Sequence, residues 1–128
     1  AELPYLMMGW KVAVVKTAVE DWEPYALDVL AGILDGGSSS RFSRELIREQ
    51  QVAAGISAYN SAFSRLDDVF TIAGTPAQGK SVDDVKQSVL NQLDKIKTEP
   101  VTEAELQRVK TQVIASSVYQ RDSVFYQA

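Results

Sequence analysis

The N-terminal stretch 3–15 has the two-residue spacing of a β-strand. Alternate residues from Leu6 onward would share one face of the strand, and all of them are apolar: Leu6, Met8, Trp10, Val12 and Val14. The other face carries Tyr5, Met7, Gly9, Lys11 and Ala13. Apolar residues on both faces favour a strand that is covered on one side and touches another domain on the other. A buried strand of a self-contained core also fits this pattern.

Three later stretches show the three- and four-residue apolar spacing of amphipathic helices. The first follows Asp21, a predicted N-cap, with the stripe Tyr25, Val29, Leu30, Ile33 and Leu34. The second begins at Ser81, with Asp84 close to a capping box, and has the stripe Val82, Val85, Val89, Leu93 and Ile96. The third begins at a Thr102–Glu105 capping box, and its stripe is Leu106, Val109, Val113 and Ile114.

The stretch 34–49 predicts the end of one helix and the start of another. Gly36 and Gly37 can adopt the left-handed backbone that closes a helix. One of the serines at 38–40 is expected to accept hydrogen bonds from the first amides of the next helix. In that helix three arginines fall three and four residues apart and share a face: Arg41, Arg44 and Arg48. We interpret this face as solvated, with pairs such as Arg41–Glu45.

Two strands are predicted at 52–63 and 69–75, joined by a turn at 64–68. Such a short connection implies an antiparallel hairpin. The predicted order is therefore strand, helix, helix, strand, strand, helix, helix. This order predicts an α+β fold, a two-layer sandwich of a small, mostly antiparallel sheet packed with helices, in one domain spanning 1–128. Apolar residues continue to the C-terminus without a glycine cap or polar tail, so we expect these residues to be part of a longer polypeptide.

Composition removes several kinds of chemistry. The net charge of −4 argues against a nucleic-acid surface, and no apolar run is long enough to span a membrane. The chain has no histidine and no cysteine, the main ligands of zinc, and histidine is the usual base of nucleophilic triads. The adjacent acidic pairs at 67–68 and 83–84 are interpreted as a turn and a helix N-terminus. We therefore assign no catalytic residue, no metal ligand and no cofactor to this chain.

The chain resembles a non-catalytic domain of the inverted-zincin peptidases, the family of pitrilysin, insulin-degrading enzyme and mitochondrial processing peptidase. The matching pieces, in order, are the strand at 6–15, the helix ending in Ile-Leu-Asp-Gly-Gly at 33–37, Ser-Ser-Arg-Phe at 39–42, Glu-Leu-Ile-Arg-Glu at 45–49 and Thr-Glu-Ala-Glu-Leu at 102–106. The structural signature that carries most of the resemblance is Gly36, Gly37, Ser39, Ser40 and Arg41.

This resemblance implies the α+β architecture of LuxS and of processing-peptidase halves. It also implies that this chain is the second domain of one half. Each half of such a peptidase contains two similar domains, and the two halves enclose a peptide or protein substrate. Zinc is then expected in the parent protein, on a His-x-x-Glu-His helix of an upstream domain. The implied partners are an adjacent homologous domain or half and the substrate. Because bacterial relatives are often exported, the resemblance also implies a periplasmic location.

Many family members hold the substrate backbone with an arginine and, seven residues later, a tyrosine. If Val52-Ala53 aligns with the Leu-Ala before that tyrosine, the tyrosine position is Ala54 and the arginine position is Ile47. The pair is therefore absent in register. Arg48 and Tyr59 are the candidate substrate-facing replacements, and the alternatives for them are a surface salt bridge and a packed strand tyrosine.

Three functions remain open on the sequence. In the first, the chain is a domain of a working zinc endopeptidase. In the second, it is a domain of an inactive homologue that serves as a scaffold or partner subunit. The third is a protein-binding module that uses the 6–15 strand as an edge for peptide addition. A His-x-x-Glu-His motif upstream would separate the first from the second.

Overall fold

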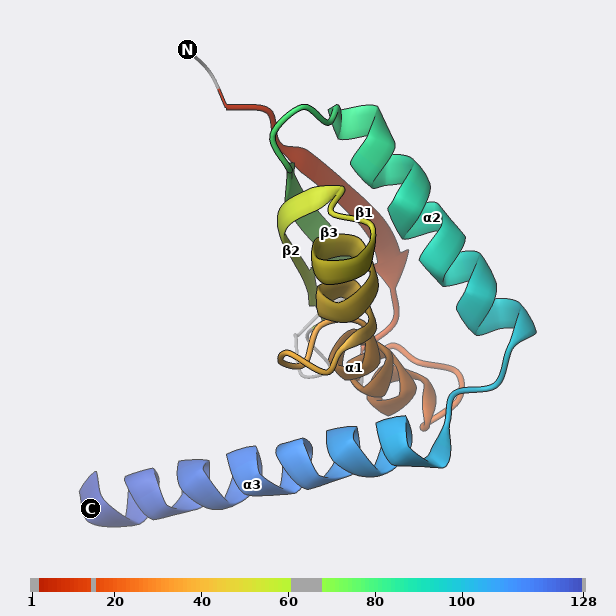
Figure 1. The fold of residues 1–128 in the computed structure, drawn as a ribbon. Coiled ribbons are helices and arrows are strands. Elements are labelled where there is room, and N and C mark those ends of the chain that lie inside the picture. Colours follow the sequence, from red (N-terminus) through yellow and green to blue (C-terminus); the bar gives the residue numbers. More distant parts are fainter. Residues whose placement is uncertain (1–2, 15, 61–67, 128) are drawn as a thin grey trace.

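The computed structural model describes residues 3–14, 16–60 and 68–127, with side chains as far as residue 115 (Figure 1). Its elements are β1 (Leu6–Val12), α1 (Glu23–Leu34), η1 (Phe42–Glu49), β2 (Ala53–Tyr59), β3 (Asp68–Pro76), α2 (Val82–Thr98) and α3 (Glu103–Gln127). This order confirms the predicted succession and the α+β class. The expected turn at 64–68 and the strand end at 61–63 fall outside the described residues, except for Asp68, which begins β3.

The three described strands form one antiparallel sheet in the order β1-β3-β2. Leu6 lies opposite Gly74 on β3, and Tyr59 of β2 lies opposite Thr71. One face of the sheet packs under the helices, with a core of Leu6, Leu34, Phe42, Leu46, Val52, Ala53, Phe70, Ile72, Val85 and Val89. The long helix α3 runs below α1 and continues past the rest of the fold toward the C-terminus (Figure 1).

The outer face of β1 is open in this structure. Met7 is 66 % exposed and Tyr5 is 58 % exposed, whereas Leu6 is buried. The inward face of the strand was therefore predicted correctly. The alternative of a strand buried on both sides in a self-contained core is wrong for this chain.

Helix η1 is wider than an α-helix, and the predicted serine cap is wrong. The amide of Gln50 donates to the carbonyl of Glu45, five residues earlier, at 2.8 Å. Arg41, which precedes η1, already has helical backbone angles, whereas a capping residue needs extended ones. The hydroxyl of Ser40 instead donates to the carbonyl of Gly37 at 2.7 Å and closes the turn.

The other helix predictions need smaller corrections. Helix α1 follows Trp22, whose backbone is helical, so Asp21 is not its cap. The capping boxes of α2 and α3 are confirmed, since the Ser81 hydroxyl accepts from the Asp84 amide and Thr102 and Glu105 bond reciprocally. Three residues of the predicted apolar stripes are at least half exposed: Tyr25, Val113 and Ile114. The last two follow the buried Val109 along α3.

Candidate functional site

The glycine break between α1 and η1 packs closely against side chains of α3. Gly37 has φ = +104°, the left-handed backbone predicted for it. Gly36 is required for a different reason, which is close approach. A Cβ atom on Gly36 would collide with the carbonyl oxygen of Gly32 and lie 2.9 Å from Nη1 of Arg108. The two glycines therefore serve separate purposes, one conformational and one steric.

Side chains from α3 satisfy the carbonyl groups at the end of α1. The Arg108 guanidinium donates to the carbonyl of Gly36 at 2.6 Å and to that of Gly32 at 3.1 Å. The amide of Gln112 also donates to Gly36, at 2.9 Å. The last carbonyls of a helix lack intrahelical partners and carry partial negative charge, so a cation is favoured there. Val109 lies between these polar residues on α3 and packs so closely on Gly32 that a Cβ there would meet it at 2.8 Å.

A second contact with α3 comes from the last residue of the sequence signature. Arg41 is 7 % exposed, and its guanidinium donates to both carboxylate oxygens of Glu105, at 2.7 and 3.0 Å. The hydrogen bond from Arg41 is the largest of the effects that lower the pKa of Glu105, which falls to about 2 although burial acts in the opposite direction. We call this set the α1–α3 junction: Gly32, Gly36, Arg41, Glu105, Arg108 and Gln112.

The predicted solvated arginine face is wrong for Arg41. Its partner is Glu105, 64 residues away, and not Glu45. Arg44 remains partly exposed and bonds to Glu45 at 3.3 Å, while Arg48 is exposed. The three arginines therefore differ in environment. Nothing in their local spacing distinguishes the buried one, because the partner belongs to a distant helix. The spacing of Glu105, Arg108 and Gln112 on one helix face was the available signal for the junction.

Glu45 joins η1 to α2 through a polar contact that the sequence interpretation missed. The Gln92 amide donates to its carboxylate at 2.6 Å, and Lys95 does so at 3.3 Å. Burial alone would raise the pKa of Glu45, but the hydrogen bonds from Gln92, Arg44 and Lys95 together lower it. Gln92 is 2 % exposed. In the sequence it lies three residues after Val89, on the apolar stripe of α2, and a polar residue at such a position was the signal for a buried polar contact.

A small polar hollow of about 240 Å³ lies beside the junction. Its lining is Ser39, Arg44, Thr102, Ala104, Glu105 and Arg108. This places Ser39 of the signature next to the start of α3. Each charged group of the lining already has a partner: Glu105 is bound by Arg41, Arg44 bonds to Glu45, and Arg108 donates to backbone carbonyls of the glycine break.

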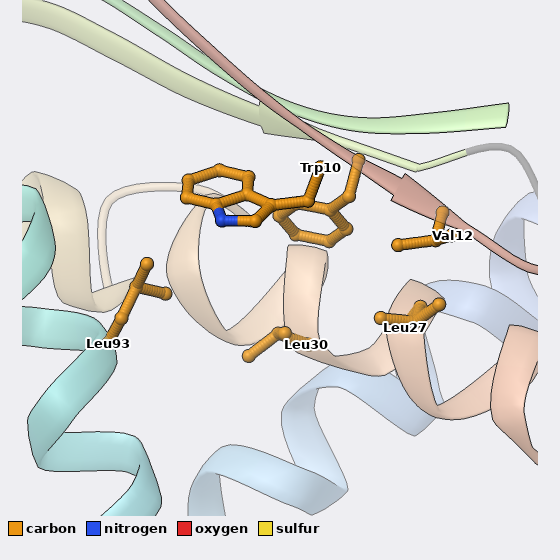
Figure 2. A pocket seen from close by; sticks show the side chains of 6 residues that line it. Trp10, Val12, Leu27, Leu30 and Leu93 are labelled. Carbon is orange, nitrogen blue, oxygen red and sulfur yellow. The ribbon is translucent and has the colours of Figure 1, made fainter.

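An apolar hollow of about 130 Å³ lies between the sheet and helices α1 and α2 (Figure 2). We call it the Trp10 hollow, and its lining is Trp10, Val12, Leu27, Leu30, Phe70 and Leu93. The rings of Trp10 and Phe70 meet edge to face, with centroids 6.4 Å apart. A shallower hollow beside it shares Leu27 and Leu30 and extends to Trp22. The Trp10 hollow is lined only by apolar residues, so it has no acid, base or metal ligand.

The two candidate substrate-facing residues lie on different elements. Arg48 is near the end of η1, and Tyr59 is the last residue of β2, where it is 64 % exposed. Tyr59 is therefore not the packed strand tyrosine of the alternative interpretation. Solvent access is necessary for contact with a substrate and does not establish it, so the role of both residues stays a prediction.

Within the described residues, no group of three or more His, Cys, Asp or Glu side chains could hold a metal ion. The described residues therefore do not provide a set of side chains that could bind zinc, and we assign no zinc chemistry to them. The helices in the same described part include none with the length and apolar character of a membrane span.

Comparison with known proteins identifies the family. Residues 1–113 match the model of the peptidase M16 inactive domain, and this chain belongs to that family. It is 31 % identical over 104 residues to an uncharacterized zinc protease of Rickettsia felis, an alignment that covers 81 % of this chain and 24 % of that protein. The resemblance to a metallopeptidase family, drawn from the sequence alone, is confirmed.

The fold is also that of a solved protease. A crystal structure of a protease from Helicobacter pylori matches with a TM-score of 0.81 and 24 % sequence identity, over 93 % of this chain and 28 % of the other. At that identity the likeness concerns the fold alone. The chain spans about a quarter of the length of both relatives.

Proposed function

We propose that this chain is the non-catalytic, substrate-chamber domain of a longer zinc-dependent metalloendopeptidase that acts on peptides or proteins. The observation that carries the proposal is the match of residues 1–113 to the peptidase M16 inactive domain, in a chain without histidine or cysteine. In this proposal the zinc ion belongs to an upstream domain with a His-x-x-Glu-His helix. An adjacent homologous domain or half is the partner against which this domain packs.

The α1–α3 junction supports a structural role. Its charged groups are used in internal hydrogen bonds: Arg41 binds Glu105, and Arg108 binds backbone carbonyls of the glycine break. Buried charges that are fully paired hold elements in one arrangement, whereas catalytic groups need access to substrate. The signature residues in this proposal therefore keep the chamber wall rigid, and contact with substrate falls to exposed residues such as Arg48 and Tyr59.

The test uses the complete polypeptide that contains residues 1–128. We expect it to carry an upstream His-x-x-Glu-His motif, to bind zinc, and to cleave unstructured peptides in a reaction that a chelator abolishes. Replacing the motif glutamate with glutamine is the matched control for contaminating peptidases. We expect the purified 1–128 chain to cleave nothing. Zinc-dependent cleavage by 1–128 itself would contradict the proposal.

The second candidate, a domain of an inactive homologue that acts as scaffold or partner subunit, shares every feature of the domain itself. A complete polypeptide without the upstream motif and without bound zinc, which still associates with an active peptidase half, would favour it. Substitutions at Arg48 and Tyr59 separate the two further. In a working peptidase, Arg48→Ala and Tyr59→Ala are expected to raise KM with little change in kcat, because they would act on substrate binding alone.

A further inference from the structure

The polar hollow beside the α1–α3 junction brings together two arginines from different parts of the chain. Arg44 belongs to η1 and Arg108 belongs to α3, and both line this hollow of about 240 Å³. Arginine side chains bind the oxygens of phosphate and carboxylate groups through parallel N–H bonds. A hollow lined by two arginines is therefore a candidate site for a negatively charged oxygen ligand.

Arg108 brings a positive charge to the hollow, and no ion pair joins it to a carboxylate within the described residues. Its two hydrogen bonds go to the carbonyl oxygens of Gly36 and Gly32, at 2.6 and 3.1 Å. These carbonyls carry only partial negative charge. The lining includes the Glu105 carboxylate, but Arg41 already binds both of its oxygens. The charge of Arg108 therefore remains in excess.

Arg44 also keeps part of its charge and most of its hydrogen-bond donors. It bonds to Glu45 at 3.3 Å. The same carboxylate group accepts a hydrogen bond from Lys95 at 3.3 Å and a shorter one from Gln92 at 2.6 Å, so two cations share one negative charge. The Arg44 side chain is 42 % exposed. A guanidinium group has more N–H donors than this single bond uses, so Arg44 can bind a ligand without leaving Glu45.

The polar hollow is large enough for a small oxyanion. A water molecule occupies about 30 Å³ in the liquid, so a space of about 240 Å³ holds a phosphate group together with several waters. Ser39 is an exposed member of the lining, and its hydroxyl is a further donor. The Trp10 hollow offers the opposite chemistry, because every residue that lines it is apolar.

We propose that the polar hollow binds one inorganic oxyanion of the size of phosphate between Arg44 of η1 and Arg108 of α3. The site goes beyond the proposed peptidase function, since it needs neither zinc nor a nucleophile. Each arginine keeps its present protein partner and uses its remaining N–H groups for the anion. The bound ion then joins η1 to α3 alongside the Arg41–Glu105 pair, so it stabilises the docked position of α3.

The test is a calorimetric titration of inorganic phosphate into the complete polypeptide that contains residues 1–128, after dialysis against a chelator to remove any zinc. Sodium chloride keeps the ionic strength constant, which separates a binding site from general screening of surface charge. We expect saturable binding of phosphate at the hollow. Heats that do not saturate would overturn the proposal. Acetate that binds as tightly as phosphate would overturn it too, because the hollow would then take a carboxylate.

Matched variants locate the bound ion. Arg44→Gln removes a cation from the lining, whereas Arg48→Gln removes an exposed cation of the same helix that is not in the lining. We expect Arg44→Gln to weaken phosphate binding at least roughly tenfold and Arg48→Gln to change it less than about twofold. Arg108→Lys retains the charge but loses the planar fork, and we expect roughly fivefold weaker binding. Circular dichroism reports whether each variant is folded, and a folded lining variant that binds phosphate as tightly as the wild type would overturn the proposal.

Discussion

The α1–α3 junction and the Trp10 hollow are two places where helices meet the rest of the fold, and they are built in opposite ways. At the junction, polar groups are buried and paired, with Arg41 7 % exposed against the Glu105 carboxylate. At the hollow, apolar groups remain partly exposed around about 130 Å³ of unfilled space. The difference indicates that the junction is complete within this chain.

The largest expected effect is the loss of the buried ion pair. Arg41→Ala leaves Glu105 without its bidentate partner, and we expect the free energy of unfolding to fall by about 3 kcal/mol. The exposed arginine of η1, Arg48, is the matched control, and Arg48→Ala should change stability by less than about 0.5 kcal/mol. Urea denaturation of 1–128 measures both. Similar losses of unfolding free energy in the two variants would show that the Arg41–Glu105 pair stabilises the protein no more than a surface arginine does.

A slightly smaller effect is expected at the glycine break. Gly36→Ala forces a methyl group against the Gly32 carbonyl and the Arg108 guanidinium, and we expect a loss of about 2 to 3 kcal/mol. Gly55 is the control, because a Cβ atom there meets nothing within 4 Å. Thermal unfolding of the two alanine variants compares them directly. A tolerated Gly36→Ala would mean that α1 and α3 can separate at little cost.

The junction also predicts a pH dependence. The pKa of Glu105 is lowered from 4.5 to about 2 in the folded protein, so its contribution is complete above pH 4.5 and is lost as the pH falls toward 2. We expect the wild type to lose about 2 kcal/mol more than Glu105→Gln between pH 5 and about pH 2. Unfolding curves collected at several pH values measure the difference. Parallel curves for the two proteins would contradict the ion pair.

The smallest effects are expected at the hollow. Trp10→Ala removes a ring that is 36 % exposed beside unfilled space, so we expect a loss of only about 1 kcal/mol, below the usual cost for a fully buried aromatic residue. Trp22 is 64 % exposed, and Trp22→Ala should be close to neutral. Urea denaturation of the two variants of 1–128 measures the difference. Equal losses in the two variants would contradict a packing contribution from the contact of the Trp10 ring with Phe70.

Local patterns predicted the elements of this protein because each depends on residues close together in sequence. The two-residue alternation around Leu6 and the capping box at Thr102 and Glu105 specify a strand and a helix start without help from distant contacts. The pair of glycines marked the break between helices for the same reason. The α+β class followed from the order of these elements, and the family followed from the resemblance carried by the signature at Gly36 to Arg41.

Tertiary structure decided which groups are partners. Arg41 turns away from Glu45 because Glu105, far along the chain, offers a buried bidentate contact that a neighbour on a solvated helix face cannot match. Gly36 is required by the Gly32 carbonyl of its own helix and by the Arg108 guanidinium of α3, and Trp10 lies at a rim because its strand is at the edge of the described sheet. Sequence spacing determines which residues share a face of one element. Only the packing of elements determines what that face meets, and this is why the junction and the hollow became visible in the structure.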